Sequence, residues 1–301
     1  MSAAEATDAT EATDAVGVPD GADADRQRAR ALSFGGDAAG YDEARPSYPA
    51  GLVDDLLAGR SAPAVLDVGC GTGKAGRLLA ARGARVLGVE ADERMAAVAR
   101  SHGIAVEVSR FEDFDPAGRR FALCTAAQAW HWVDPVAGPA KAATALVPGG
   151  QLALLWNLRE QPDPAVTAAF DACYRQLAPE LAGTTMVLGG PPEARGLEAH
   201  LDLVTASGSF VDGEVRRYRW QTRYDTAAWR ALLSTQSDHR LLDPARRERL
   251  LDGAARVVDD LGGVLDIAYV TLALLARRRA DEPAGAGASV GPDQQPAGGA
   301  G

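Results

Sequence analysis

The segment of this sequence best suited to hold a ligand is the glycine-rich turn 69–73, Gly-Cys-Gly-Thr-Gly. It follows a short apolar run at 64–68 and leads into a helical pattern at 73–82. Glycines permit positive φ and let a ligand approach the backbone, and the N-terminus of the next helix offers free N–H groups to polar atoms. Together with Gly76 the turn also satisfies the GxGxxG spacing of dinucleotide-binding folds, so by itself it leaves the ligand open.

Three carboxylates stand at the ends of successive predicted strands, where they could contact such a ligand. Asp67 lies two residues before the first glycine, a position that would repel a pyrophosphate but suits an ammonium group. Glu90 ends the second strand at the spacing expected of a ribose-binding acid. Glu112 follows the third strand, where it could accept the amino group of an adenine. The ordered set favours S-adenosylmethionine over NAD, and an NAD-dependent oxidoreductase is the alternative.

The segment Trp130-His131-Trp132 follows the fourth predicted strand, on the edge where ligands of open α/β sheets gather. His131 could accept a proton from a substrate hydroxyl or carboxyl, because the unperturbed pKa of histidine is near neutrality. It could also contact the substrate without proton transfer, or pack with the two tryptophans as an aromatic wall. Methyl transfer from a sulfonium is an in-line displacement that positioning and water exclusion can accelerate, so a base is not required.

Arg45 precedes Pro46 near the start of the predicted folded part of the chain. Arginine is the natural bidentate partner of a carboxylate, so Arg45 could reach a carboxylate of the cofactor or the substrate. Tyr41 and Tyr48 would then form part of a lid over the pocket. The alternative is an ordinary surface arginine.

The elements that must position these residues follow from the alternation of apolar runs and helical patterns. Up to residue 156 strands alternate with helices, with 111–119 only weakly helical, which predicts a doubly wound parallel sheet covered on both faces. Gly262-Gly263 predicts a tight turn that lets the last two strands pair antiparallel. The predicted strands are 64–68, 85–90, 104–108, 121–125, 151–156, 216–223 and 264–276, and the predicted helices are 73–82, 92–102, 135–146, 163–177, 192–200, 226–235 and 244–260.

These motifs, taken in order, resemble the class I S-adenosylmethionine-dependent methyltransferases of the methyltransferase type 11 family. The chain is similar in particular to a branch with an N-terminal YxxxRPxYP pattern, here at 41–49, some members of which methylate small carboxylic acids. The resemblance covers roughly 31–279. The motifs that carry it are VLDVGCGTG (65–73), VLGVEAD (86–92), FEDFD (111–115), AQAWHW (127–132) and LVPGGQLALLWN (146–157).

The resemblance implies a Rossmann-like α/β fold, with a doubly wound seven-stranded mixed sheet and helical C-terminal additions, and S-adenosyl-L-methionine as cofactor. Arg110 departs from the family, which often has Asp there, and this leaves Glu112 as the favoured acceptor for the adenine. Carried over by position, the cofactor-binding residues are Asp67, Gly69, Cys70, Gly71, Gly73, Glu90, Ala91, Met95, Phe111, Glu112 and Gln128. The expected substrate or lid residues are Tyr41, Arg45, Tyr48, Trp130 and Trp132, with His131 as the catalytic candidate.

Composition limits the other classes of function. The net charge of −10 lies mostly in the two ends, because residues 1–26 hold seven acids and one Arg, and 281–301 hold three acids and no base. The near-neutral middle argues against a nucleic-acid surface, which would gather Lys and Arg. The three cysteines are far apart, so neither a disulfide framework nor a metal site is expected. Without a signal peptide or membrane span in the pattern, we expect a cytoplasmic protein of open oligomeric state.

We therefore predict a methyltransferase domain at 31–279 between a disordered acidic tail, 1–30, and a disordered Gly/Pro/Ala tail, 280–301. The expected acceptor is a small molecule, with an oxygen of an organic acid or hydroxylated metabolite favoured over N- or C-methylation. The alternatives are a non-catalytic S-adenosylmethionine-binding protein, or a methyltransferase acting on a protein or RNA. Within the domain we expect a lid segment at 31–60, a cofactor-binding core at 61–157, and a substrate-facing region with the last strands at 158–279.

Overall fold

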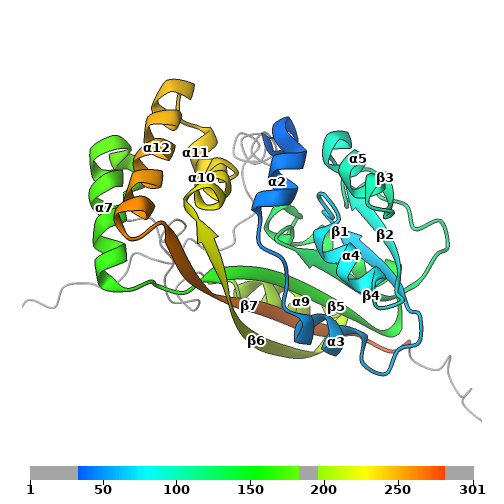
Figure 1. Cartoon of the computed structure of the whole chain (residues 1–301). Helices are drawn as coiled ribbons and strands as arrows, with labels where there is room; N and C mark the ends of the chain where they lie inside the picture. The colour runs from blue at the N-terminus through cyan, green and yellow to red at the C-terminus, as the bar shows by residue number, and fades with distance from the viewer. Residues whose placement is uncertain (1–32, 183–195, 282–301) are drawn as a thin grey trace, which may run out of the picture.

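The described strands of the chain form one mixed sheet in the order β3-β2-β1-β4-β5-β7-β6 (Figure 1). The structure, a computed structural model, describes residues 33–182 and 196–281. The two predicted disordered tails lie outside these ranges, except for residues 280 and 281. No helix within the described ranges is long and apolar enough to cross a membrane.

Five strands of the sheet are parallel, and the last two run antiparallel to their neighbours. The parallel half is covered on both faces, so runs such as Val65–Val68 are buried throughout, as expected when no face meets water. The predicted seven-stranded doubly wound sheet is thereby confirmed. The strands are β1 Ala64–Val68, β2 Arg85–Glu90, β3 Ala105–Val108, β4 Phe121–Ala127, β5 Leu146–Arg159, β6 Phe210–Asp225 and β7 Val264–Arg278.

Aspartates begin several of the helices, because their side chains accept a hydrogen bond from a free backbone N–H of the first turn. Asp92, Asp163, Asp225 and Asp243 all do so. The α-helices are α2 Ala38–Ala44, α3 Ala50–Leu57, α4 Lys74–Ala80, α5 Glu93–Ser101, α6 Ala137–Ala145, α7 Pro164–Leu177, α9 Ala199–Ala206, α10 Thr226–Ser234, α11 Ser237–Arg240 and α12 Pro244–Asp260. Short 3-10 helices are η1 Ser33–Asp37, η2 Trp130–Trp132 and η3 Pro179–Leu181.

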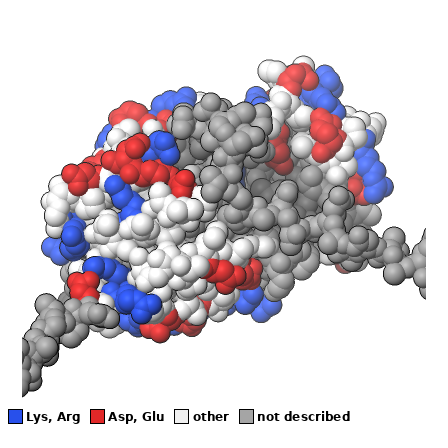
Figure 2. All heavy atoms as spheres, turned by 180° about the vertical axis from the view of Figure 1, so that it is seen from behind, with Lys and Arg blue, Asp and Glu red and all other residues white. Residues whose placement is uncertain are grey.

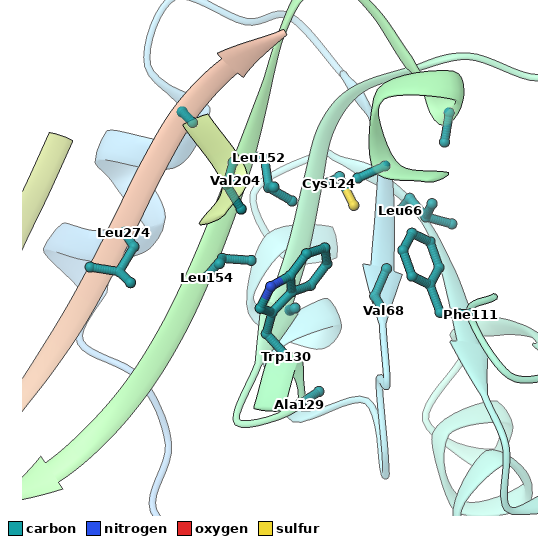
Figure 3. Close-up of a cluster of buried hydrophobic side chains, with 14 of the residues drawn as sticks. Leu66, Val68, Phe111, Cys124, Ala129, Trp130, Leu152, Leu154, Val204 and Leu274 are labelled. Atoms are coloured by element: carbon teal, nitrogen blue, oxygen red, sulfur yellow. The ribbon is translucent and has the colours of Figure 1, made fainter. Parts of the chain in front are cut away.

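Three large hydrophobic cores lie along the sheet. Two pack against the parallel strands: one includes Leu66, Cys124 and Trp130 (Figure 3), and the other includes Leu52, Val65 and Leu155. The third lies under a helical lobe made of α7, α10, α11 and α12, at the far ends of β6 and β7 (Figure 1). Phe170 and Trp229 are at its centre. The helix α2 packs between this lobe and α5, so it bridges the two parts of the molecule.

Four predicted elements differ clearly from the structure. The strand expected at 151–156 is longer, because β5 runs from Leu146 to Arg159. The short helix expected at 192–200 starts later: α9 runs from Ala199 to Ala206, and residues 192–195 lie outside the described ranges. The segment 111–119 contains turns and no helix. The strand expected at 216–223 extends to 210–225, because it pairs with β7 at 210–211 and 214–225, on both sides of a bulge.

Candidate functional site

The glycine turn forms one wall of a cavity of about 350 Å³ at the carboxyl ends of the parallel strands. Gly69 and Gly71 both have positive φ, at 60° and 56°. A Cβ on Gly69 would come within 2.6 Å of the Ala129 Cβ, so only glycine fits between β1 and the segment after β4. Turn and cavity thus occupy the position where ligands bind in open α/β sheets.

Most of the predicted site residues line this cavity. Asp67, Gly73 and Trp130 are not among the lining residues. Those that do line it are Tyr41, Arg45, Tyr48, Gly69, Cys70, Gly71, Glu90, Ala91, Met95, Phe111, Glu112, Gln128, His131 and Trp132.

Asp67 lies beneath the turn. Its side chain is 1% exposed, and its Oδ1 accepts a hydrogen bond of 2.8 Å from the Thr125 hydroxyl. Its Oδ2 is buried against the Gly76 backbone and has no hydrogen-bond partner among the described residues. Burial raises the pKa of this carboxyl to about 6, although the Thr125 hydroxyl opposes the rise. Direct contact between Asp67 and a bound ammonium stays a prediction. The position of Asp67 beneath the turn does not favour it, because the residue does not line the cavity.

Glu90 stands on the cavity wall at the end of β2. Its carboxylate accepts hydrogen bonds from the backbone N–H groups of Gly71, at 2.8 Å, and Asp92, at 2.9 Å. Burial raises its pKa, while these N–H groups oppose the rise. A carboxylate has about four lone-pair positions, so Glu90 can hold the turn and still accept hydroxyl groups of a ligand.

Glu112 also lines the cavity, and it connects two loops. Its Oε1 accepts from the Asp134 backbone N–H at 2.9 Å, and its Oε2 lies 3.2 Å from Arg110 Nη2. Arg110, the residue that departs from the family, is therefore an ion-pair partner of the expected adenine acceptor. Phe111 is buried, with its ring 6.1 Å from that of Trp130. Trp130 itself is 2% exposed and packs in the core shown in Figure 3 instead of on the cavity wall.

Gln128 is held in an unusual backbone conformation directly after β4. Its φ is 56°, which is uncommon for a residue other than glycine. Its backbone N–H donates to Leu155 O at 2.8 Å, and its side chain donates to Asn157 O at 3.1 Å. Strained backbone of this kind persists where neighbouring contacts enforce it, and it gathers at binding sites.

His131 meets the cavity as a neutral ring. The Trp156 indole N–H donates to its Nδ1 at 3.3 Å, and the Trp156 ring stacks on that of His200, with centroids 5.4 Å apart. Burial and the nearby His200 lower the pKa of His131 to about 4. Because an indole N–H can only donate, the neutral imidazole carries its proton on Nε2. This tautomer can donate a hydrogen bond from Nε2 but cannot accept a proton there.

Residues 38–48, here called the roof segment, cover the cavity with Tyr41, Arg45 and Tyr48. Arg45 Nη2 donates to Thr235 O at 2.8 Å, and its guanidinium lies 5.1 Å from the centroid of the Tyr41 ring. Arg45 Nε is buried and has no hydrogen-bond partner in the described part of the chain. Because the Arg45 side chain lines the cavity, its guanidinium is a candidate contact for an anionic ligand.

Several lining residues were missed in the sequence, among them Asn157 and His200. Asn157 could have been found, because it is a polar residue late in a long apolar strand, close to the edge where ligands bind. His200 ends the helix expected at 192–200, and nothing in the sequence distinguishes it there from a surface histidine. In the described residues, no group of three His, Cys, Asp or Glu side chains is placed to hold a metal ion.

Comparisons with known proteins agree with this geometry. Residues 65–150 match the family model of the methyltransferase domain. The chain is 38% identical over 138 residues to an uncharacterized methyltransferase of Mycobacterium tuberculosis. This alignment covers 45% of this chain and 56% of that protein. It is 32% identical over 111 residues to a ubiquinone biosynthesis O-methyltransferase of Idiomarina loihiensis, 34% of this chain and 45% of that protein. The chain spans about half the length of the curated relatives it matches.

A solved structure from Anaeromyxobacter dehalogenans, described as a type II methyltransferase, has the same fold. It superimposes with a TM-score of 0.57 at 24% identity, covering 79% of this chain and 99% of the other. At this identity the likeness concerns the fold.

Proposed function

We propose that this chain, which has the fold of the class I S-adenosylmethionine-dependent methyltransferases and a methyltransferase domain at 65–150, transfers a methyl group from S-adenosylmethionine to a small molecule. The observation that carries the proposal is the cavity beside the glycine turn and Glu90, two features that lie within the matched segment. The favoured acceptor is an oxygen of an organic acid or hydroxylated metabolite.

The residues present suit the donor. The backbone at Gly69 and Gly71 leaves room for a ligand, and Glu90 offers acceptor positions for ribose hydroxyls. Ala91, Met95 and Phe111 supply apolar surface for an adenine ring next to Glu112. S-adenosylmethionine supplies a methyl group on a positively charged sulfonium, which an oxygen can take in an in-line displacement.

The roles of the chain's own residues on the acceptor side follow from their hydrogen-bonding capacity. Arg45 binds an anionic acceptor through its guanidinium, and Tyr41 and Tyr48 close the roof segment against water. His131 donates from Nε2 to an acceptor oxygen and orients it. An ionised carboxylate needs no base, so the neutral His131 ring supports an organic acid over an alcohol as acceptor.

Methylation of RNA is disfavoured by the surface. On the face seen in Figure 2, the described Lys and Arg side chains are interspersed with Asp and Glu and do not gather into a basic patch. The arginines of β6 are in part paired with acids, as in Arg216–Glu214 and Arg223–Asp266. A protein acceptor and a non-catalytic binding role are the alternatives that the experiment below separates.

The test combines donor binding with turnover. Calorimetry should detect S-adenosylmethionine binding, and a panel of small carboxylic acids, hydroxylated compounds and proteins should yield S-adenosylhomocysteine with a carboxylic acid. Binding of NAD without S-adenosylmethionine would refute the donor assignment. Donor binding without turnover on any member of the panel would favour the non-catalytic alternative.

With the acceptor in hand, two variants test the role of His131. Gln can donate a hydrogen bond from its amide, whereas Phe cannot, so His131→Gln should keep most of kcat and His131→Phe should lose about threefold to tenfold. Above pH 5, kcat should not fall through protonation of His131, because the pKa of His131 is already about 4. Equal losses in Gln and Phe, with a limb near neutrality that both remove, would identify His131 as a general base instead.

A further inference from the structure

Asp42, on α2 of the roof segment, makes an unusual set of contacts for a residue outside the cavity. Its Oδ1 accepts a hydrogen bond of 2.6 Å from the Thr72 hydroxyl and one of 2.7 Å from Arg77 Nη2. Its Oδ2 lies 3.2 Å from His102 Nε2. The side chain is 13% exposed. Burial by itself would raise its pKa, but the Thr72 hydroxyl and the charges of Lys74 and Arg77 outweigh this and lower it, so the carboxylate is ionised.

Thr72 belongs to the glycine turn, where it lies between Gly71 and Gly73, and it is 2% exposed. On one side of the turn, Glu90 of the core accepts from the Gly71 backbone N–H. On the other side, Asp42 of the roof segment accepts from the Thr72 hydroxyl. Two carboxylates from different parts of the chain therefore hold one ligand-binding turn.

The roof segment reaches the acceptor side of the cavity within a few residues of Asp42. Arg45 donates to Thr235 O at the C-terminal end of α10, and the Asn157 side chain donates to Ser47 O at 2.8 Å. Tyr41, next to Asp42, lines the cavity. One segment thus contacts the donor turn through Asp42 and the acceptor side of the cavity through Arg45 and Ser47.

We infer that Asp42 is a positioning residue that couples docking of the roof segment to the shape of the donor turn through the Asp42–Thr72 hydrogen bond. This inference rests on the proposed function. Docking of the roof segment favours the turn conformation that binds the donor, and a bound donor favours docking, because coupling between two events is reciprocal. Donor binding therefore closes the acceptor site as well.

The experiment uses the full chain and S-adenosylhomocysteine as the probe. Calorimetry measures its affinity for the wild type, Asp42→Ala, Thr72→Val and the double variant. Hydrogen exchange measures how far the probe slows amide exchange in residues 38–48. Thr72→Ser keeps the hydroxyl and serves as the conservative rescue, and Glu43→Gln removes a neighbouring exposed carboxylate of the same helix as the charge control. Thermal midpoints without the probe report whether each variant folds.

Each single variant should weaken the probe about tenfold, as expected for a hydrogen bond to a charged group. The double variant should bind the probe about as weakly as the single variant of lower affinity, since each substitution removes the same Asp42–Thr72 hydrogen bond. Probe-induced protection of 38–48 should be lost in Thr72→Val, which leaves the Asp42–Arg77 pair intact, and restored in Thr72→Ser. Glu43→Gln should match the wild type.

Two results would overturn the inference but not the proposed function, provided that the wild type binds the probe. One is a double variant whose loss of affinity equals the sum of the two single losses in free energy. The other is a folded Thr72→Val variant that loses less than twofold in affinity. A wild type that binds no S-adenosylhomocysteine would overturn both the inference and the proposed function.

Discussion

The substitution Asp67→Asn should change the way stability of the ligand-free chain depends on pH. Asp67 is almost fully buried, one of its oxygens has no hydrogen-bond partner among the described residues, and its pKa is raised to about 6. In the unfolded chain the same carboxyl titrates near 3.8. Because the folded state holds the proton of Asp67 more tightly, the contribution of this residue to stability is largest at low pH. That contribution falls as the pH rises through the folded pKa. An Asn at this position does not ionise, so this loss should disappear.

The size of the effect follows from the two pKa values. Each pKa unit is worth about 1.4 kcal/mol, so ionised Asp67 lowers the free energy of unfolding by about 3 kcal/mol at pH 8. At pH 4.5 the folded carboxyl is still protonated while the unfolded one is mostly ionised, and the loss is about 1 kcal/mol. The destabilisation by Asp67 therefore grows by about 2 kcal/mol between pH 4.5 and 8. Any constant amount by which an Asn side chain changes the free energy of unfolding at every pH does not alter this pH-dependent part.

Urea unfolding at pH 4.5, 6 and 8 measures this difference directly. Stability relative to the wild type should rise by about 2 kcal/mol from the lowest to the highest pH in Asp67→Asn. The exposed Asp113→Asn should show no such rise and serves as the control. Parallel curves for the wild type and Asp67→Asn would refute the raised pKa and with it the picture of a desolvated carboxylate beneath the turn.

Two further predictions concern the donor site. Glu90→Ala should weaken S-adenosylhomocysteine about tenfold or more in calorimetry, since hydrogen bonds to a charged group are worth about 1.5–3 kcal/mol. A loss within about twofold, the size expected for the exposed Glu93→Ala, would mean that the ribose assignment is wrong. Gly69→Ala should abolish measurable binding, because the new Cβ would meet the Ala129 Cβ at 2.6 Å. Gly83→Ala has a similar positive φ but open space around it, so it should lower the thermal midpoint and leave binding unchanged; equal binding losses in both variants would point to general strain.

The donor half of the site could be predicted because it depends on local order along the chain. A strand, a glycine turn and a helix follow one another without a break, and Glu90 ends the next strand, so topology alone brings them to one edge. The position of a residue at a strand end does not say which way it faces. Asp67 was expected to point at the cavity, yet it faces Thr125 within the sheet and the helix above it.

The acceptor half depends on contacts between distant segments, which leave little trace in the sequence. Trp130 and Trp132 are equivalent in the sequence pattern, but the one-turn helix η2 directs Trp130 into the core and leaves Trp132 on the cavity wall. The role of Asp42 could not be predicted, because a single carboxylate near the start of the fold has the sequence pattern of an ordinary surface residue. Its partner Thr72 lies 30 positions away.

The position of β7 has a consequence for how the chain folds as it is made. In the sheet β7 lies between β5 and β6, although it follows both in the chain. A nascent chain that ends before Val264 therefore presents two open edges, one of them the Leu-rich strand β5. Residues of β7 also belong to all three large hydrophobic cores, Leu272 and Leu274 to the first, Ala273 and Leu275 to the second, and Leu265 and Ile267 to the third. Insertion of this strand closes the sheet and joins the three cores in one late step, so slow synthesis or truncation there exposes the chain to aggregation.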